Sequence, residues 1–432
     1  MSSEFPKGSE WRKWDLHIHS PLSILNNQFP KLSDGKPHWE PFLQKLESLD
    51  MAVIGITDYF TIEGYKELKK FKEQGRLKNI YTILPNIEFR LKNILASRGG
   101  DEKRLNLHVI FSEDVSTTDI EEHFLHDIPF YYEGNPQDSD ERRKLKISNL
   151  ESLGKELIEQ HEPFRKMGVP PLEIGAMQAV VDHGEITHIL TKDSRFKNKY
   201  VVVLSADEWD KINWNTQAHH VRKALLQKSD MVFSSNLKTR QWCLGKDSYT
   251  DGLEHFIREF KTLKPCIHGS DAHRIEDIGR PCAKRGDRSH NCDKNPAECD
   301  LRYCWIKADP TFEGLKQILY EPEERVHIQQ NDPSPVISNY SIKTVPEQLV
   351  ASEQVDLLVA STSLGEQPNQ RLQNLGVRYR GGRGTKPDSL TNFTDESNSA
   401  CAMKLIRGSI NQVIQTSPPG CHGLCEQTII PQ

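Results

Sequence analysis

Short apolar runs alternate with amphipathic stretches from about residue 14 to residue 320. Apolar runs of about four to eight residues predict buried strands, whereas apolar residues that recur every three or four positions predict helices. The expected strands are 51–57, 81–88, 105–112, 201–204, 231–234 and 266–269, and the expected helices include 62–74, 219–228 and 253–261. Strands that alternate with helices predict an α/β fold with a parallel sheet, either a barrel or a doubly wound sheet.

Polar residues at the strand ends favour the barrel. Asp58, Glu88, His108 and Asp271 each lie at or just past the C-terminal end of an expected strand. A (β/α) barrel collects its active site from the ends of several strands, whereas a doubly wound sheet binds ligands mainly at one switch point. The distribution of these four residues therefore predicts a barrel with its site at one mouth.

Two stretches depart from this pattern. Residues 136–195 are rich in charge and interrupted by Pro170 and Pro171, so we expect an elaborated crossover or a lid there. Residues 331–432 contain no Trp and a single Phe, and Ser, Asn, Gln, Gly and Pro dominate. Such a stretch can bury little apolar surface. We expect a domain over 1–330 and a loosely ordered or small C-terminal extension over 331–432, a truncated or replaced partner domain.

The overall composition excludes several classes of protein. The chain has 432 residues, 36% of them hydrophobic, and a formal net charge of −5, so binding to nucleic acid would need a local basic patch. No run approaches the roughly 18 apolar residues of a membrane span, and the N-terminus lacks the pattern of a signal peptide. Nine cysteines, an odd number, argue against a secreted disulfide scaffold. We expect a cytoplasmic protein that does not bind membranes.

Histidines and carboxylates occur at metal-ligand spacing in two segments. His17 and His19 are two residues apart in an apolar run, and side chains at i and i+2 of a strand share a face. Asp271 and His273 repeat this spacing after another expected strand, with His268 just before them. Imidazole and carboxylate are common ligands of divalent metals. Either pair alone is also compatible with surface residues, but together they predict a metal site.

Further candidates lie between these two segments, each with a plain structural alternative. Glu88 is either a ligand or a solvated carboxylate at the end of its strand. His108 is either a ligand or a hydrogen-bonded core histidine inside an apolar strand. Asp58 either orients the site or caps the helix that begins near residue 62. His183 is retained as a further candidate ligand, and His188 as a surface residue.

Taken in order, these motifs resemble the PHP (polymerase and histidinol phosphatase) family. The resemblance covers roughly residues 10–325. The family pattern is HxH, then GITD, then a Glu at a strand end, then a His within a strand, then SDAH. This sequence carries it as HIH (17–19), GITD (55–58), NIEF (86–89), NLHVIF (106–111) and GSDAH (269–273). Both the order and the spacing match.

Two further segments resemble one subgroup of this family. TDYFTIEGY at 57–65 and WIKADPTFEGLKQILYEPEERV at 305–326 are similar to the TrlF-type PHP domains that precede SMC-like or AAA-like ATPases. The resemblance implies a distorted (β/α)7 barrel of the TIM-like type. It also implies a centre of two or three metal ions for phosphoester hydrolysis, a nucleic-acid or nucleotide substrate, and an ATPase partner.

The chain departs from the family pattern in three places. Tyr59 stands where the family usually has His, and residues 20–28 lack the third histidine that usually follows HxH. We therefore expect two metal ions rather than three. The segment 381–389 fails the spacing of a P-loop, and Pro387 follows Lys386 where Ser or Thr would bind magnesium. No ATP binding is predicted.

Chemical roles follow from the ligand types. Imidazoles mixed with carboxylates suit Zn²⁺ or Mn²⁺ better than Mg²⁺. We expect Asp58, Glu88 and Asp271 to act in catalysis, with Glu88 as a bridging ligand and Asp58 as the residue that orients an imidazole or the attacking water. The expected ligands of the two ions are His17, His19, Glu88, His108, Asp271 and His273, with His183 and His268 in reserve.

Cations close to these ligands could bind phosphate. Arg90, Lys92, Arg274 and Arg280 lie within a few residues or a short loop of the candidate ligands. Each is either a phosphate-binding residue or a solvated surface charge.

Cysteines cluster near the end of the first domain. Cys282, Cys292, Cys299 and Cys304 lie close together with His290 among them, at a spacing of no common zinc module. A structural zinc site is one interpretation, and a buried Cys304 beside Trp305 is another. The pair Cys421 and Cys425 gives a weaker signal of the same kind.

Three functions remain open at this level. The first is a metal-dependent phosphoesterase, most simply a nuclease in DNA repair or antiphage defence, where the setting rests on the resemblance. The second is a small-molecule phosphatase of the histidinol-phosphate type. The third is a non-catalytic binding module with a degenerate metal site, for which Tyr59 is the main support.

Overall fold

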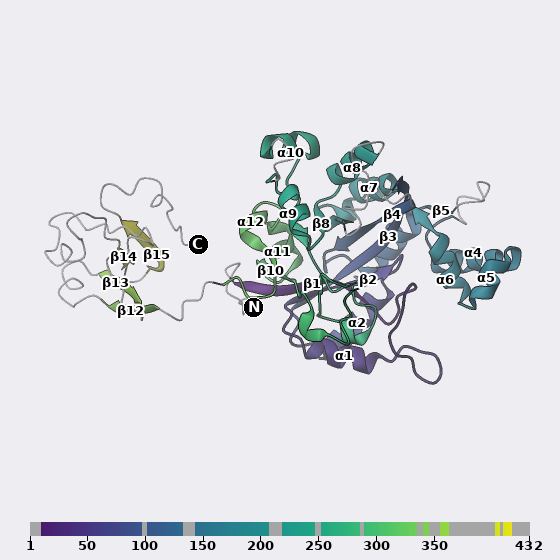
Figure 1. Ribbon diagram of the computed structural model, residues 1–432, viewed down its shortest axis with the longest axis horizontal. Coiled ribbons are helices and arrows are strands. Elements are labelled where there is room, and N and C mark those ends of the chain that lie inside the picture. Colours follow the sequence, from purple (N-terminus) through teal and green to yellow (C-terminus); the bar gives the residue numbers. More distant parts are fainter. Residues whose placement is uncertain are drawn as a thin grey trace. The chain divides into compact units, whose positions relative to one another are not determined.

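The computed structural model describes residues 10–96, 102–132, 143–206, 218–246, 252–285 and 289–334, together with four strands nearer the C-terminus. The chain divides into two units, Met1–Ser334 and Pro335–Gln432. All the candidate metal ligands except Cys421 and Cys425 lie in the first unit. The elements of this unit are shown in Figure 1.

A mixed sheet forms the centre of the first unit. Nine of its strands follow one another in the order β11-β10-β1-β2-β3-β4-β7-β8-β9, and the short strands β5 and β6 pair beside β3. The strands are β1 (Trp11–His19), β2 (Val53–Tyr59), β3 (Thr82–Ala96), β4 (Glu102–Phe111), β5 (Phe130–Tyr131), β6 (Val180–Val181), β7 (Tyr200–Ser205), β8 (Met231–Phe233), β9 (Cys266–Ile267), β10 (Tyr303–Lys307) and β11 (Val326–Gln329).

Backbone hydrogen bonds bring the β9 end of this sheet back to β1, the third strand of the order, and so bring strands β1 to β9 close to closure. The segment that follows β9 runs beside β1, where the amide of Asp271 donates to the carbonyl of His17 at 2.8 Å. The amide of His19 donates to the carbonyl of Ala272 at 3.0 Å, and Ile18 and Ala272 form a parallel bridge. The result is an α/β protein with a nearly closed, barrel-like sheet.

The direction of β4 corrects the expectation of a parallel sheet. β1, β2 and β3 are parallel to one another, as are β7, β8 and β9. β4 is antiparallel to both of its neighbours, β3 and β7. β3 and β4 are consecutive long strands that pair directly, which requires opposite directions. His108 on β4 therefore reaches the site from a strand that runs against its neighbours.

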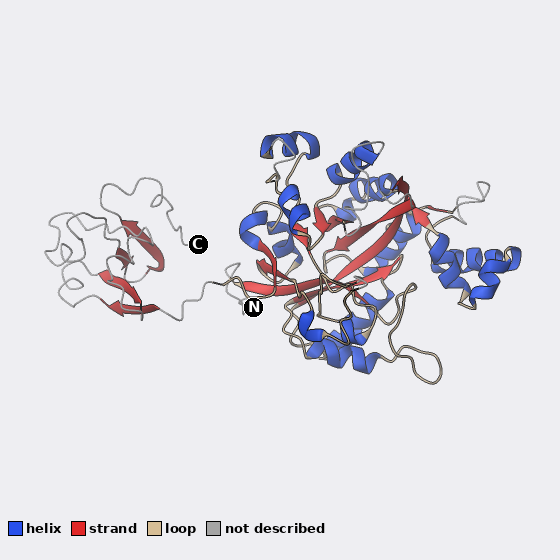
Figure 2. Cartoon of the chain, viewed as in Figure 1, coloured by secondary structure: helices blue, strands red, loops and turns tan. Residues whose placement is uncertain are grey.

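Helices flank the sheet (Figure 2). Helix α1 turns Phe42, Leu43 and Leu46 into the core, and α2 does the same with Tyr65 and Leu68. The helices of this unit are α1 (Trp39–Glu47), α2 (Glu63–Glu73), α3 (Thr117–His123), α4 (Ile147–Gln160), α5 (Glu162–Met167), α6 (Pro171–Gln178), α7 (His183–Lys192), α8 (Ala218–Gln227), α9 (Leu237–Cys243), α10 (Leu253–Phe260), α11 (Phe312–Gln317) and α12 (Pro322–Arg325).

The charged stretch 136–195 is largely helical where the structure describes it. Helices α4, α5 and α6 group together beyond the short strand β5 (Figure 1). Gly154 and Gly175 let α4 and α6 approach closely, because a Cβ on Gly154 would lie 1.7 Å from the carbonyl oxygen of Pro171. The sequence pattern missed these helices. Their role as a crossover or lid stays a prediction.

Most expected strands and helices are present with shifted ends. The helix expected at 62–74 is α2, and the strands expected at 51–57 and 201–204 are β2 and β7. The largest difference is β3, which runs on to Ala96, so that Glu88 lies within the strand rather than at its end. The hairpin of β3 and β4 extends past the level of the candidate site.

The second unit contains a four-stranded antiparallel sheet among its described residues. Its order is β12 (Tyr340–Thr344), β13 (Val355–Thr362), β14 (Ala402–Ile406) and β15 (Ser409–Thr416). The expected loose order of 331–432, the segment 381–389 and the pair Cys421 and Cys425 lie mainly or wholly outside the described residues. Within the described part of the chain, no helix has the length and apolar character needed to cross a membrane.

Candidate metal centre

Strand β1 places polar and apolar side chains on opposite faces of the sheet. Successive residues of a strand alternate in direction, so from Trp14 onward one face of β1 carries apolar groups and the other polar ones. The strand is buried on both faces in its C-terminal half. The apolar face consists of Trp14, Leu16 and Ile18, and the polar face of Asp15, His17 and His19. The sheet therefore carries a buried polar patch on its concave side.

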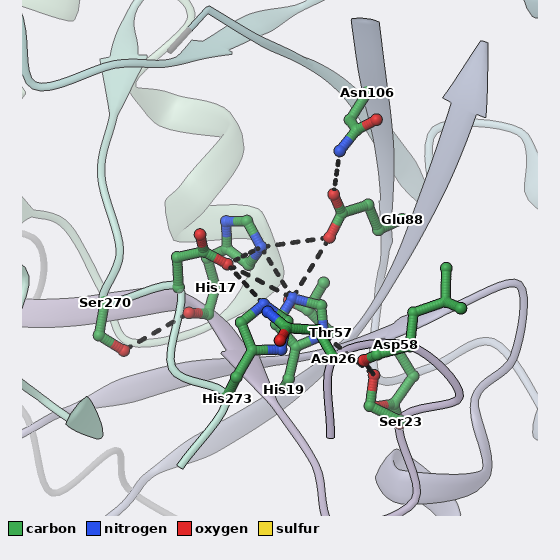
Figure 3. Close-up of polar contacts among 12 residues, drawn as sticks. His17, His19, Ser23, Asn26, Thr57, Asp58, Glu88, Asn106, Ser270 and His273 are labelled. Atoms are coloured by element: carbon green, nitrogen blue, oxygen red, sulfur yellow. Dashed lines mark hydrogen bonds and ion pairs between the residues drawn. The ribbon is translucent and has the colours of Figure 1, made fainter. Parts of the chain in front are cut away.

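Glu88 and His108 continue this patch on the neighbouring strands. They are directly opposite each other in the pairing of β3 with β4. Asn106, two residues before His108, donates through Nδ2 to Oε1 of Glu88 at 2.5 Å. The other oxygen, Oε2, lies 3.4 Å from Nε2 of His17 and 3.3 Å from Nε2 of His19. One Glu88 oxygen is therefore held by the protein, and the other faces the imidazoles (Figure 3).

Asp271 reaches the same point from the segment after β9. Its Oδ1 lies 3.2 Å from Nε2 of His17, 3.5 Å from Nε2 of His19 and 3.4 Å from Nε2 of His273. Its side chain is 53% exposed, whereas that of Glu88 is 3% exposed, so Asp271 lies at the open side of the cluster. Its backbone φ is 48°, in the left-handed region that few residues other than glycine adopt.

The spacing of these atoms suits a shared metal ion. Two ligand atoms about 2.1 Å from one ion, at a tetrahedral angle, are about 3.4 Å apart. The Nε2 atoms of His17 and His19 are 3.3 Å apart, and the carboxylate contacts above lie between 3.2 and 3.5 Å. We call this group the barrel cluster, and it comprises His17, His19, Glu88, His108, Asp271 and His273.

His108 supplies an independent indication of a metal site. It is fully buried, and among the described residues neither of its ring nitrogens has a hydrogen-bond partner. Buried polar groups almost always have a partner, so a buried imidazole without one indicates a ligand at that place. Burial lowers the pKa of His108 to about 3, which keeps the ring neutral and able to bind a metal.

Electrostatics within the barrel cluster keep the carboxylates ionised. Burial alone would raise the pKa of Glu88, but the imidazoles of His108, His17 and His19 hold it well below its usual value. Burial would also raise the pKa of Asp271, but the neighbouring imidazoles, His17 first, hold that pKa well below its usual value. Burial opposes the charged form of His19, yet hydrogen bonds to Asp271 and Glu88 raise the pKa of His19 to about 9. In the absence of metal, protons therefore occupy part of this site.

Neighbouring polar groups orient the imidazoles. Ser23 Oγ lies 3.2 Å from Nδ1 of His19, which leaves Nε2 to face the cluster. The ring of His19 stacks on His273, with centroids 3.9 Å apart, and on Tyr59, with centroids 5.0 Å apart. The position where the PHP pattern has a histidine thus carries a ring that packs on a cluster residue. Burial, Glu88 and Asp271 raise the pKa of Tyr59, so its phenol stays neutral.

Asp58 lies one step behind the barrel cluster. Its carboxylate accepts from the amide of Ser20 at 3.1 Å, from Ser20 Oγ at 2.9 Å and from the amide of Gly64 at 3.2 Å. The contact to Gly64 holds the first turn of α2, although the N-cap residue of that helix is Ile62 and not Asp58, so the capping alternative was wrong about the cap itself. Gly64 leaves room for it, because a Cβ there would lie 2.3 Å from Oδ2 of Asp58. Burial raises the pKa of Asp58 to about 6. Its role in orienting the site stays a prediction.

Sequence reasoning missed a further buried carboxylate, on β1 itself. Asp15 accepts from the amide of Ser270 at 2.9 Å and from the amide of His17 at 3.3 Å. It thereby joins β1 to the segment that carries Asp271. Gly269 permits this close approach, because a Cβ there would lie 2.6 Å from Cβ of His17 and 2.7 Å from Oδ1 of Asp15. The i, i+2, i+4 spacing of Asp15, His17 and His19 was the signal in the sequence.

A cavity of about 560 Å³ borders the open side of the barrel cluster. His268 lines it, and burial lowers the pKa of His268 to about 4. Asp271 lines the same cavity, together with two arginines that sequence reasoning did not select, Arg285 and Arg302. Arg285 donates to the carbonyl of Ser270 at 2.8 Å and Arg302 to that of Ser235 at 2.7 Å.

The selected cations have contacts elsewhere. Arg90 donates to the carbonyl of Met177 at 2.8 Å, and Lys92 pairs with Asp182. Arg274 pairs with Asp277 and Asp293. Arg280 donates to the carbonyl of Cys292. His183 begins α7 and joins none of the metal-ligating groups that the described residues form. Phosphate binding by the selected arginines stays a prediction.

The molecule is thus an α/β protein whose nearly closed, barrel-like sheet holds a cluster of metal-ligating side chains. The described residues contain three groups of such side chains. Two overlap in the barrel cluster, and the third, in a loop outside the sheet, is formed by Cys282, His290, Cys292 and Cys299. No protein-family model matches the chain, and no curated protein matches it either.

Proposed function

We propose that the chain is a metal-dependent phosphoesterase of the PHP type. The observation that carries the proposal is the barrel cluster, in which imidazoles and carboxylates from β1, β3, β4 and the segment after β9 face one point. Four of the five motifs that resemble the PHP pattern contribute ligands to this cluster, and the fifth contributes Asp58 just behind it. The sheet supports a distorted barrel of seven strands, because the segment after β9 bonds back to β1. The seven strands from β1 to β9 along the sheet are β1, β2, β3, β4, β7, β8 and β9.

The donor set suits two ions of Zn²⁺ or Mn²⁺. The described residues form one set of His17 with His19 and Asp271, and another of His17 with Glu88 and His108. An imidazole nitrogen has one lone pair, so His17 binds one ion at a time. A carboxylate offers several lone pairs, and Oε2 of Glu88 faces both imidazoles of β1. Glu88 would therefore hold metal together with the imidazoles of β1.

Divalent cations in such a site supply positive charge, lower the pKa of water and stabilise the charge that develops on a phosphoester. The chain contributes rigidity and charge around them. Asn106 holds one oxygen of Glu88, Ser23 fixes the ring of His19, and Asp15 ties Ser270 to β1. Asp271 lies at the border of the cavity, where it can contact both a cation and a bound substrate.

Phosphodiesters of nucleic acid are the proposed substrates, and DNA repair or antiphage defence is the proposed setting. Arg285 and Arg302 border the cavity beside Asp271 and are its proposed contacts for an anionic ligand, in addition to their ion pairs with Asp277 and Asp300. The net charge of the chain gives no general attraction to a polyanion, so these local cations carry the argument. An ATPase partner is proposed from the resemblance to TrlF-type proteins.

Metal analysis combined with two ester substrates tests this function. Purified full-length protein should contain transition metal in the barrel cluster and should hydrolyse bis(p-nitrophenyl) phosphate faster than p-nitrophenyl phosphate. His17→Ala and Asp271→Ala should reduce hydrolysis of the diester and of DNA or RNA to background. His188→Ala is the matched control, because His188 is exposed on α7.

Three outcomes would change the assignment. Faster hydrolysis of the monoester would favour a small-molecule phosphatase. Less than one equivalent of metal bound through nitrogen and oxygen, without any hydrolysis, would favour a binding module. Cleavage of nucleic acid that His17→Ala and Asp271→Ala leave unchanged would overturn the proposed site.

A further inference from the structure

Four soft ligands converge outside the barrel cluster. Nε2 of His290 lies 3.8 Å from Sγ of Cys282, 3.5 Å from Sγ of Cys292 and 3.4 Å from Sγ of Cys299. All four ligand atoms lie within 4.8 Å of one another. A tetrahedral zinc ion with Zn–S bonds of about 2.3 Å and Zn–N bonds of about 2.1 Å places sulfur and nitrogen about 3.5 Å apart. The three distances centre on that value.

From this geometry we propose that Cys282, His290, Cys292 and Cys299 bind one structural zinc ion. The three cysteines are free rather than disulfide-bonded. A disulfide would use two of the sulfurs and leave the third, whereas the imidazole faces all three. Thiolates with one imidazole in tetrahedral array select zinc over the harder cations that bind oxygen. The proposal stands apart from hydrolysis, because it uses none of the residues of the barrel cluster.

Charge around the four ligands is compatible with this ion. Three thiolates and one Zn²⁺ leave a single net negative charge. The guanidinium of Arg280 offsets it, because Nη2 donates to Sγ of Cys299 at 3.5 Å and to the carbonyl of Cys292 at 3.2 Å. The backbone amides of Lys284 and Asp300 also donate to the sulfur of Cys282. Hydrogen bonds of this kind are typical around zinc thiolates.

The loop that carries these ligands has polar contacts but little apolar side-chain surface to bury. We call residues 282–299 the cysteine loop. Between Ala283 and Asp300 the sequence contains no aliphatic or aromatic residue larger than proline apart from the ligand His290. Its base is pinned where the amide of Ala283 donates to the carbonyl of Asp300 at 2.9 Å. A segment that buries so little apolar surface needs another source of stability, such as a cross-link. A structural zinc ion supplies folding free energy directly.

The zinc ion would also fix one wall of the cavity. Cys282, Ala283 and Arg285 line the cavity beside Asp271. Arg274, one residue after the ligand His273, pairs with Asp293 inside the cysteine loop at 2.7 Å. Ordering the loop therefore orders groups that border the barrel cluster. Loss of zinc should loosen this wall without removing a ligand of the barrel cluster.

Zinc stoichiometry and X-ray absorption test the proposal on the full chain, purified without chelator and supplied with zinc chloride under reducing conditions. Wild-type protein should show sulfur atoms about 2.3 Å from zinc. Cys299→Ser and His290→Ala should each lose about one equivalent of zinc and the sulfur signal. Cys304→Ala is the matched control, because Cys304 lies buried in β10 outside the group. His17→Ala should keep the sulfur-bound zinc.

Alkylation of the wild-type protein gives a readout that needs no variant. Zinc should slow labelling of Cys282, Cys292 and Cys299 at least tenfold, and removal of zinc with a chelator should restore it. Zinc bound only through nitrogen and oxygen, or equal labelling of the three cysteines with and without zinc, would overturn the proposal. Sulfur-bound zinc in a protein without hydrolytic activity would support it and would count against the proposed function alone.

Discussion

The barrel cluster and the cysteine loop gather metal ligands in opposite ways. The barrel cluster takes its ligands from residues 17 to 273, and each lies on or beside a strand of the buried sheet. The cysteine loop takes all four from residues 282–299, within a segment that lacks an apolar core. In the first case the fold brings the ligands together. In the second case, a bound ion would have to stabilise the folded conformation of the loop.

The chemistry of the ligands follows the same division. The barrel cluster combines imidazoles with two carboxylates, and Asp271 leaves it open toward a cavity. This arrangement suits a catalytic ion, which keeps a position for water or substrate. The cysteine loop offers three sulfurs and one imidazole, a complete tetrahedral set, which is typical of a structural ion. The comparison predicts that the two regions respond differently to the same treatments.

The largest expected effect comes from removing all metal with a chelator. Hydrolysis of the diester should fall to background, while far-ultraviolet circular dichroism changes little, because the sheet does not depend on the ions. The cysteine loop should become sensitive to trypsin at Lys284 and Lys294, both of which are exposed. Mass spectrometry of the fragments gives the measurement. Cleavage that is equal with and without zinc would remove the contrast between the two regions.

Asn106→Ala should weaken the barrel cluster alone. Loss of the hydrogen bond to Oε1 frees Glu88 to rotate, and changes behind a metal ligand typically cost about 10- to 100-fold in metal affinity or activity. Titration with Mn²⁺ and steady-state kinetics would measure both. Zinc in the cysteine loop should stay unchanged. A hydrolysis rate within twofold of wild type would show that Asn106 does not position Glu88.

The affinity of the barrel cluster for metal should rise with pH. His19 has its pKa raised to about 9 by Asp271 and Glu88, so the metal-free site binds a proton at neutral pH. Metal binding requires the neutral ring and releases that proton. Affinity should therefore increase about tenfold per pH unit between roughly pH 6.5 and 8.5. Competition with a chromophoric chelator would measure the slope, and a flat profile would contradict the raised pKa.

The metal-free protein should show the opposite trend in stability. A raised pKa in the folded state stabilises the fold most fully below the ordinary histidine value near 6.5, and this contribution is lost as pH rises toward about 9. Thermal melts of the metal-free protein across this range would show it, with His19→Gln as the control. A melting temperature that rises through this range in wild type but not in His19→Gln would contradict it.

The smallest expected effect concerns packing behind the barrel cluster. Gly269→Ala places a methyl group 2.6 Å from Cβ of His17 and 2.8 Å from its backbone nitrogen. Overpacking of this kind typically costs about 1–3 kcal/mol in the free energy of unfolding. Urea unfolding would measure it, with Gly168→Ala as a comparison at a position where nothing lies within 4 Å. Gly168 has a positive φ, so its own cost reports backbone strain without crowding.

Sequence reasoning located the ligands better than it described the sheet. The spacing of His17 with His19, and of Asp271 with His273, reflects side chains that alternate along extended backbone, which is a local property. The apolar runs predicted β2, β7 and β8 within a few residues. The direction of β4 and the length of β3 were wrong, because pairing between strands is not encoded in the period of either strand.

The cysteine loop also shows what sequence patterns do not predict, here among residues close together in the chain. The sequence presented four clustered cysteines and one histidine, with burial of Cys304 beside Trp305 as one interpretation. The structure places Cys304 in the buried strand β10 and sets His290 against the other three sulfurs. Only the path of the loop between residues 282 and 299 could make that choice, because ligand spacing matched no common module.

The sequence by itself determined which chemical groups were present and which face of each strand they occupy, since alternation along a strand needs only neighbouring residues. The tertiary structure decided which of these groups meet. Closure of the sheet through His19 and Ala272 brings Asp271 to His17 across most of the chain's first unit. Contacts at that separation depend on the packing of the whole sheet, which no local pattern contains.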